Sequence, residues 1–242
     1  MRYSKNIFEH NTKLAEDIIK KSYSKDIKTI TMGFPDIYGR FMGKKFDIDY
    51  FNSGIIKKGS NACNYLLGCD IEMNPLPNSL LSSYSLGYGD FTMIPDLYSK
   101  RKVNYLNNEL QYFFFSDLID IEDNTIVGYA PRQLLRQSEE KLELKMKVEC
   151  EINFTAFNER YRKSIKNINI MEPITDHSNL SNVFYSQSNE LLISTLLEKL
   201  QYSSIPVASI YGDDGYGQFK VCLEKTDLIE MCDNITLLKL VS

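Results

Sequence analysis

The sequence contains no tryptophan and only two histidines, His10 and His177. This scarcity argues against a catalytic triad built on histidine and against a metal site with several histidine ligands. The five cysteines are an odd number without Cys-x-x-Cys spacing, a pattern that favours free thiols over disulfides or a zinc site. We therefore expect buried free thiols in a reducing compartment.

Long apolar runs are also missing. No stretch approaches the roughly 18 apolar residues of a membrane-spanning helix, and the N-terminal segment lacks the apolar run of a secretory signal. Lysine and arginine are scattered along a chain of net charge −4, which is not the basic footprint of a nucleic-acid-binding protein. We expect a cytoplasmic protein with no nucleic-acid partner and no membrane partner.

The chain has 242 residues, of which 43% are apolar, so it is long enough for one large domain or two small domains with hydrophobic cores. A polar turn at Glu122–Gly128 separates an aromatic-rich segment from Ala130-Pro131, where proline suits the first position of a helix. We place a domain boundary near residues 122–130. The predicted domains are residues 1–121 and 122–242.

Apolar periodicity predicts helices and strands in both domains, and hence an α+β fold. In the first domain the predicted elements are a helix over 7–23, strands at Lys28–Phe34, Met42–Phe46, Asn61–Glu72, Phe91–Ile94 and Gln111–Ile121, and non-helical segments at Phe46–Gly54 and Asn74–Tyr88. In the second domain they are helices from Pro131, at Ser188–Gln201 and at Thr226–Leu240, and strands at Met146–Phe154, Val207–Tyr211 and Gln218–Leu223.

Two acidic residues stand two positions apart on the predicted strand Met146–Phe154. Because side chains alternate across a strand, Glu149 and Glu151 share one face, and the apolar residues between them point to the core. Adjacent carboxylates repel each other unless a cation lies between them, and Mg²⁺ or Mn²⁺ prefers such oxygen ligands. Two interpretations stay open: part of a divalent-metal site, or two solvated acids on a half-exposed strand.

A second acidic feature lies at the tip of the last predicted hairpin, where Asp213 and Asp214 occupy a glycine-rich turn. Antiparallel strands can bring this tip and the strand of Glu149 and Glu151 onto one surface. Carboxylates that converge from separate strands suit metal-assisted phosphoryl transfer, because the metal ions neutralise phosphate charge. Spacing alone does not establish that convergence.

Five short motifs of this sequence resemble those of the glutamine synthetase family and occur in the same order. They are Asn64–Asp70 (NYLLGCD), Gly87–Phe91 (GYGDF) followed by Pro95-Asp96, Ala130–Leu135 (APRQLL), Glu149-x-Glu151, and Gly217–Phe219 (GQF). Each motif alone is weak, but five in order with compatible gaps are specific, and they extend over roughly residues 27–233. The GYGDF block most resembles the branch that includes lengsin-like proteins and γ-glutamyl-amine ligases.

The resemblance implies a small β-grasp-like N-terminal domain, followed by a catalytic domain with a curved antiparallel sheet. It implies the family reaction, in which ATP phosphorylates the γ-carboxylate of glutamate and ammonia or an amine then displaces phosphate. The implied cofactors are ATP and Mg²⁺ or Mn²⁺. Because family members form rings, the implied partners are other subunits: copies of this chain in a homo-oligomer, or a full-length or complementary glutamine-synthetase-like chain.

By the same resemblance, Glu149, Glu151 and Asp213 match metal ligands, while Glu149 and Gln218 match nucleotide-binding residues. Asp213 is one methylene shorter than the family's glutamate. Lys220 stands where the family has another glutamate, and an ammonium group cannot ligate a divalent cation. Either Lys220 replaces the ion as the partner of the acids, or it is an outward strand lysine in a different register. The catalytic residues stay unassigned.

The resemblance also implies residues that this sequence lacks. The family chain continues past the point that corresponds to Ser242, and there it carries a metal-binding histidine, arginines that grip phosphate and glutamate, and further glutamates. We therefore expect an incomplete catalytic domain that is inactive alone or needs a partner half. The alternative is a non-catalytic pseudoenzyme, or a structural subunit that joins glutamine-synthetase-type rings.

Overall fold

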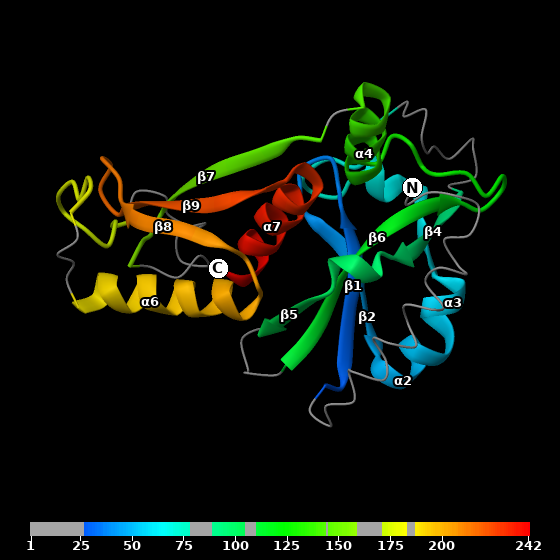
Figure 1. Ribbon diagram of the computed structural model, residues 1–242, viewed down its shortest axis with the longest axis horizontal. Coiled ribbons are helices and arrows are strands. Elements are labelled where there is room, and N and C mark those ends of the chain that lie inside the picture. Colours follow the sequence, from blue (N-terminus) through cyan, green and yellow to red (C-terminus); the bar gives the residue numbers. More distant parts are fainter. Residues whose placement is uncertain (1–26, 78–88, 105–109, 144, 159–170, 183–186) are drawn as a thin grey trace. The chain divides into compact units, whose positions relative to one another are not determined.

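A computed structural model describes residues 27–77, 89–104, 110–143, 145–158, 171–182 and 187–242 (Figure 1). These residues form two compact units. The first unit comprises the chain up to Met146 together with residues 232–241, and the second comprises Lys147–Met231. The predicted helix over 7–23, and residues Gly87 and Tyr88 of the GYGDF motif, lie outside the described residues.

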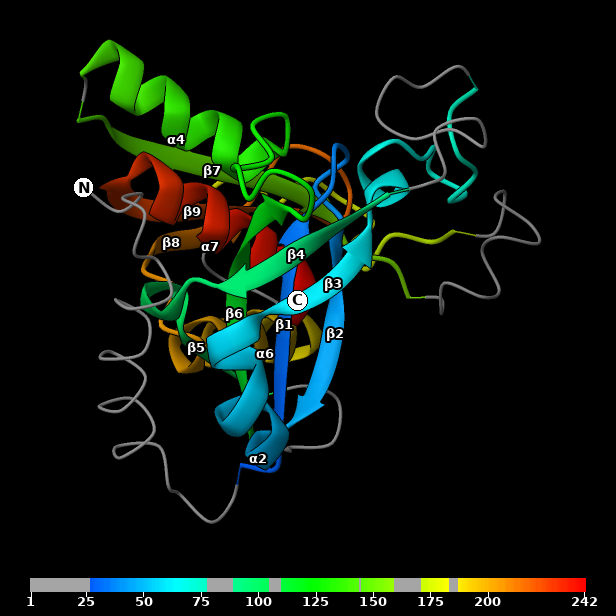
Figure 2. The ribbon, with the colours of Figure 1, turned by 90° about the vertical axis from the view of Figure 1, so that its right-hand side faces the viewer.

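The first unit is built on a curled mixed β-sheet, whose strands can be followed in Figure 2. Its strands are β1 (Thr29–Pro35), β2 (Phe41–Asp47), β3 (Ser60–Cys63), β4 (Asp90–Pro95), β5 (Arg101–Asn104) and β6 (Leu110–Asp120). Their order is β2-β1-β6-β4-β3, and β5 also pairs with β6. The pair β1–β6 is parallel, and the other named pairs are antiparallel.

Lys44 on β2 forms hydrogen bonds with β3, the strand at the other end of this order. Its Nζ atom donates hydrogen bonds to the carbonyl oxygen of Asn61, at 2.6 Å, and to Oγ of Ser60, at 3.3 Å. Ser60 and Asn61 belong to β3, which lies at the opposite end of the order from β2. The sheet therefore curls until its outer strands approach each other.

Strand β6 packs aromatic rings on both of its faces. On one face Phe114 stacks on Phe51, with ring centroids 5.4 Å apart. On the other face Phe113 and Phe115 lie against Phe41, with centroids 4.4 Å and 5.7 Å away. Since successive side chains of a strand point to opposite faces, three consecutive phenylalanines serve two packing layers. Burial of these rings is a main source of stability for the first unit.

The prediction of a non-helical segment at Phe46–Gly54 is wrong. The chain is helical there through α2 (Ile48–Tyr50), a π-helical turn (Phe51–Ile55) and α3 (Ile56–Lys58). The side chain of Asp47 caps the start, because it accepts hydrogen bonds from the backbone N–H groups of Asp49, at 2.9 Å, and Tyr50, at 3.2 Å. This cap and the apolar residues that follow it are the signals that indicate a helix.

The predicted strand at Asn61–Glu72 is correct only at its start. Strand β3 ends at Cys63, and a 3₁₀-helical turn (Asn64–Leu67) follows it. A further turn follows at Asp70, whose carboxylate stabilises it by accepting a hydrogen bond from the backbone N–H of Asn74 at 2.8 Å. The other predicted strands of the first domain correspond to β1, β2, β4 and β6, and β5 was not predicted.

Helix α4 (Pro131–Leu142) begins at its proline, as predicted. It ends at Glu143, which adopts the left-handed conformation at a φ of 50°. Helix α4 contacts β1 and β6 and so packs within the first compact unit. The predicted boundary near residues 122–130, which divides the chain into 1–121 and 122–242, therefore does not coincide with the limits of the compact units. As a statement about domains of the family, it stays a prediction.

The second unit is an antiparallel three-stranded sheet with one helix against it. Its elements are β7 (Lys147–Thr155), α6 (Gln187–Tyr202), β8 (Val207–Gly212) and β9 (Gln218–Asp227), in the strand order β7-β9-β8. Helix α6 contacts β8 and buries Leu196 and Leu200, while β9 buries Phe219 and Val221. Helix α7 (Leu228–Val241) follows β9 directly in the chain. These elements confirm the predicted helix at Ser188–Gln201 and the predicted hairpin.

Within the ranges listed above, no helix combines the length and the apolar character that a membrane crossing requires. The expected cytoplasmic location stays a prediction.

We expect Gly33→Ala to destabilise the first unit. Gly33 and Gly43 are partners across the β1–β2 pair, and a Cβ atom on Gly33 would lie 2.1 Å from the backbone oxygen of Met42. Backbone atoms of a paired strand cannot move aside cheaply, so we expect a loss of about 2–3 kcal/mol in the free energy of unfolding. Urea denaturation followed by tyrosine fluorescence measures it.

Gly54→Ala is the matched control, because a Cβ atom there meets no atom closer than the ring of Tyr50, at 3.9 Å. We expect this helical substitution to be neutral or stabilising by up to about 1 kcal/mol. Equal effects of the two substitutions would contradict the close approach of β1 and β2.

Candidate functional site

The face of β7 that carries Glu149 and Glu151 is exposed, as the sequence predicts. Exposure alternates along the whole strand, and both glutamates belong to the exposed set. Val148 and Ile152 belong to the other, half-buried set. The two acids therefore share a face. Their side chains are 70% and 62% exposed, so solvent strongly screens their mutual repulsion.

Each of these two glutamates has its own lysine on β9. Glu149 lies next to an irregularity in the β7–β9 register, and its Oε1 atom is 3.9 Å from Nζ of Lys225. Glu151 has its Oε2 atom 3.2 Å from Nζ of Lys220. Antiparallel pairing thus brings two lysines of β9 near two acids of β7, with Lys220 placed diagonally to Glu151, and opposite charges that lie close across strands attract each other.

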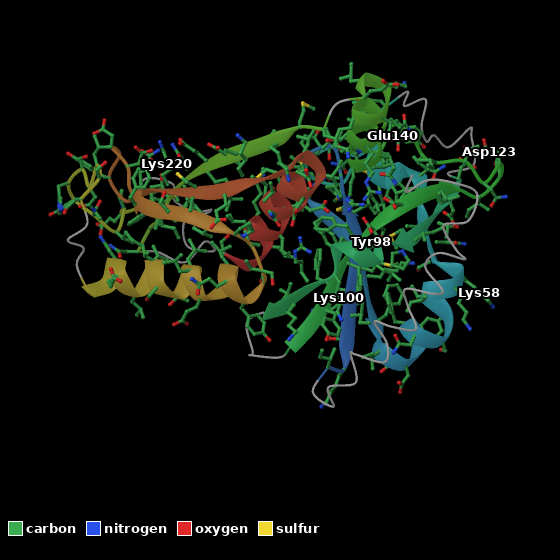
Figure 3. All side chains as sticks on the ribbon, in the orientation of Figure 1. Lys58, Tyr98, Lys100, Asp123, Glu140 and Lys220 are labelled. Carbon is green, nitrogen blue, oxygen red and sulfur yellow. The ribbon has the colours of Figure 1, made fainter. Side chains whose placement is uncertain are left out.

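Lys220 also reaches the acidic tip of the β8–β9 hairpin. Its Nζ atom is 3.9 Å from Oδ2 of Asp213, and the same carboxylate oxygen accepts a hydrogen bond from Nδ2 of Asn153 at 3.0 Å. Asn153 is the cross-strand partner of Lys220, and Tyr211 is its partner on β8. The structure therefore brings Glu151 and Asp213 together around one ammonium group. Lys220 lies on β9 in Figure 3.

The electrostatics of this group favour a charged lysine. The hydrogen bond with Glu151 raises the pKa of Lys220 above its ordinary value, and Asp213 adds to the effect. The side chain of Lys220 is 20% exposed and that of Asp213 is 15% exposed. Lys220 is thus directed at the acids and is not an outward-pointing strand lysine. At neutral pH it supplies a fixed positive charge beside both carboxylates.

The residues around Lys220 do not fit a divalent cation. Mg²⁺ or Mn²⁺ needs several oxygen ligands, and a neighbouring ammonium group repels it. In the part of the chain that the structure describes, no group of three or more His, Cys, Asp or Glu side chains is arranged to hold a metal ion. The assignment of Glu149, Glu151 and Asp213 as metal ligands stays a prediction from the resemblance.

Gln218 has a local structural partner at the hairpin tip. Its Oε1 atom accepts a hydrogen bond from the backbone N–H of Gly215 at 2.9 Å. The neighbouring Gly217 has a φ of +64°, and a Cβ atom there would lie 2.6 Å from the backbone oxygen of Ala156. Turn geometry alone therefore accounts for a Gly-Gln pair at this position. The nucleotide-binding role of Gln218 and Glu149 stays a prediction.

The sequence patterns did not identify three residues of this face: Asn153, Tyr211 and Cys222. Tyr211 has a raised pKa because of burial and a hydrogen bond with Cys222. Cys222 is the cross-strand partner of Glu151. The alternation that identified Glu149 and Glu151 also places Asn153 on their face. The pairing of Asn153 with Lys220, and of Lys220 with Tyr211, depends on the register of the strands, which no local pattern reveals.

Two other motifs meet in the core of the first unit. Arg132, from the APRQLL motif, donates from Nη2 to Oδ2 of Asp96, from the Pro95-Asp96 pair, at 2.8 Å. Both side chains are buried. These motif residues therefore stabilise the fold through a buried ion pair.

Comparisons with known proteins identify relatives of this chain. A family model described as the catalytic domain of glutamine synthetase matches residues 128–242. The γ-glutamylethanolamide synthetase GlnA4 of Streptomyces coelicolor is 30% identical over 212 residues, which cover 86% of this chain and 45% of that protein. A glutamate–isopropylamine ligase of a Pseudomonas species is 23% identical, over 92% of this chain and 48% of that protein. The chain thus spans about half the length of these curated relatives.

Solved structures give the same result for the fold. A crystal structure of a glutamine synthase homolog superimposes with a TM-score of 0.67 at 14% identity, over 88% of this chain and 47% of that one. An ADP complex of GmaS gives a TM-score of 0.65 at 16% identity, over 94% of this chain and 47% of that one. These likenesses confirm the expected fold class, a β-grasp-like region followed by part of a glutamine-synthetase-type catalytic domain. The chain belongs to the glutamine synthetase family.

Proposed function

We propose that this chain is a glutamine-synthetase-like protein that does not catalyse the family reaction by itself. That reaction is the ATP-dependent ligation of ammonia or an amine to the γ-carboxylate of glutamate, through γ-glutamyl phosphate. Members of this family typically use ATP with Mg²⁺ or Mn²⁺. Activity of this chain therefore depends on whether its residues can hold such an ion.

One observation carries the proposal: the ammonium group of Lys220 lies 3.2 Å from Glu151 and 3.9 Å from Asp213. Phosphoryl transfer depends on positioning and on stabilisation of the charge on the phosphate, which the metal ions supply. A lysine already offsets one of the two negative charges of these acids. It cannot take a metal's place in bridging phosphate oxygens, since it is tethered to β9 and hydrogen-bonded to Glu151. On this face the ammonium group of Lys220 thus lies between the two acids that the resemblance assigns to a metal ion.

A second candidate function is a subunit of an active glutamate–amine ligase. The names of the two curated relatives favour it, because both denote enzymes that join glutamate to an amine. The matched residues cover about half of each relative. In that case the chain works in an assembly with a complementary chain or with a full-length glutamine-synthetase-like chain in a shared ring. Its substrates would be glutamate and ammonia or a small amine.

We expect the purified chain to show no glutamate-dependent release of ADP. The assay contains ATP, Mg²⁺ and glutamate, with ammonia, ethanolamine or isopropylamine in separate reactions, and ADP is measured by a coupled enzyme assay. Turnover of about 1 per second or more, within the usual range for enzymes, would overturn the proposal. Circular dichroism on the same sample shows that the chain is folded. Activity that arises only when a second polypeptide co-purifies would establish the second candidate instead.

We expect Lys220→Glu to create affinity for Mn²⁺. The change removes the ammonium group and places a third carboxylate beside Glu151 and Asp213, so the affinity should rise at least about tenfold over the wild type. Lys225→Glu is the matched control, because it makes the same change of charge on the same strand, beside Glu149. Calorimetric titration with MnCl₂ measures both. An equal gain in the two variants would show a general charge effect and would contradict the role given to Lys220.

A further inference from the structure

A buried network of charged side chains lies in the first unit, apart from the hairpin of Lys220. It contains two arginines of α4 (Arg132 and Arg136), one aspartate that follows β4 (Asp96), one on β6 (Asp117) and one on α7 (Asp233). Each of the five residues is 8% exposed or less. The network therefore joins four elements that are distant in the sequence.

Arg132 is the centre of this network. It forms a bidentate pair with Asp233, from Nε to Oδ1 and from Nη2 to Oδ2, both at 2.8 Å. It also donates to Asp96 at 2.8 Å and to Asp117 at 3.0 Å. Its guanidinium carbon lies 5.4 Å from the ring centroid of Phe115, which limits access of water from that side.

Arg136 repeats two of these contacts one helical turn later. It donates from Nη2 to Asp96 at 2.6 Å and from Nη1 to the two oxygens of Asp117 at 3.1 Å and 3.2 Å. Residues four apart lie on one face of a helix, so α4 presents both guanidinium groups to the same carboxylates. Asp117 and Asp96 thus each serve two arginines.

The formal charges of the five groups do not cancel. Three carboxylates and two guanidinium groups sum to minus one when all are ionised. A buried excess charge is costly, and the usual relief is a proton taken up by one of the acids. Asp117 is the natural carrier of this proton, because its contacts with the arginines, at 3.0, 3.1 and 3.2 Å, are longer than those of Asp96 and Asp233, at 2.6 and 2.8 Å.

We propose that this network attaches α7 to the first unit in a pH-dependent way: one proton shared within the network stabilises the contact with Asp233, and loss of this proton as the pH rises towards neutrality weakens it. The charged groups that face Asp117, among the described residues, are Arg132 and Arg136 from α4, Asp96 after β4, and Asp233 from α7. The segment that responds is residues 232–241, the part of α7 that belongs to the first unit.

The pKa of Asp117 sets the pH range over which the network responds. The pKa of Asp117 is raised from 3.8 to about 7: burial is the largest cause, Arg132 acts in the opposite direction, and the charges of Asp96 and Asp233 raise the pKa further. Because the folded state holds the proton more tightly than the unfolded state, stability from this group is complete below pH 3.8. It then falls as the pH rises and reaches its lower plateau above about pH 7.

The test compares the wild type with Asp117→Asn by hydrogen exchange of residues 232–241 in the full chain. After correction for the intrinsic pH dependence of exchange, the opening constant of the wild type should rise by nearly tenfold per pH unit above pH 5 and level off near pH 7, about fiftyfold in all between pH 5 and 7. In Asp117→Asn the excess charge is absent at every pH, so the change should stay within about threefold. Asp123→Asn, in an exposed turn (Figure 3), should follow the wild type.

Two results would overturn the proposal. One is a wild-type opening constant that stays flat between pH 5 and 8, and the other is an equal rise in the wild type and Asp117→Asn. If Asp117→Asn fails to fold, carbon-13 NMR of aspartate carboxyl groups in the wild type decides. An aspartate that titrates near pH 7 supports the proposal, and the absence of any between about pH 5.5 and 8.5 sinks it.

Discussion

The pairing of Arg132 with three aspartates is the interaction on which the first unit depends. It links α4 to the end of β4, to β6 and to α7, and it does so where water has little access. Removing one partner of a buried ion pair typically costs about 3–5 kcal/mol, because the remaining charge stays buried without compensation. The hydrophobic layers on both faces of β6 supply stability without selecting one arrangement of these four elements. The charged network makes that selection.

The hairpin of the second unit contains a similar set of groups with a different physical consequence. Lys220 lies between Glu151 and Asp213, but Glu151 is 62% exposed. Exposed ion pairs contribute little to stability, typically about 0–1 kcal/mol. The effect of Lys220 is therefore local: its positive charge offsets part of the negative charge of Glu151 and Asp213 on this face. The same kinds of residue stabilise the fold in one unit and form an exposed charged surface in the other, and burial is the variable that separates the two cases.

Local patterns in the sequence predicted what depends on local physics. The period of two along β7 placed Glu149 and Glu151 on one face, and proline at the first position marked the start of α4. The helix after Asp47 was missed, although the capping aspartate is visible in the sequence. The contacts of Lys220 depend on the register of three strands, and the ion pair of Arg132 with Asp233 joins residues 101 positions apart. Such contacts follow from tertiary packing, which periodicity does not encode.

The motifs that identify the family divide into two physical classes. Asp96 and Arg132 belong to two separate motifs, and the structure joins them in one buried ion pair, so packing of the fold accounts for both residues. Glu151 belongs to a motif on an exposed strand, where folding demands little of a glutamate side chain. On this surface the position of Lys220 departs from the family pattern, while the buried network is complete. A family resemblance carried by buried pairs bears on the fold, and the chemistry has to be argued from the exposed face, where one lysine lies beside the two acids.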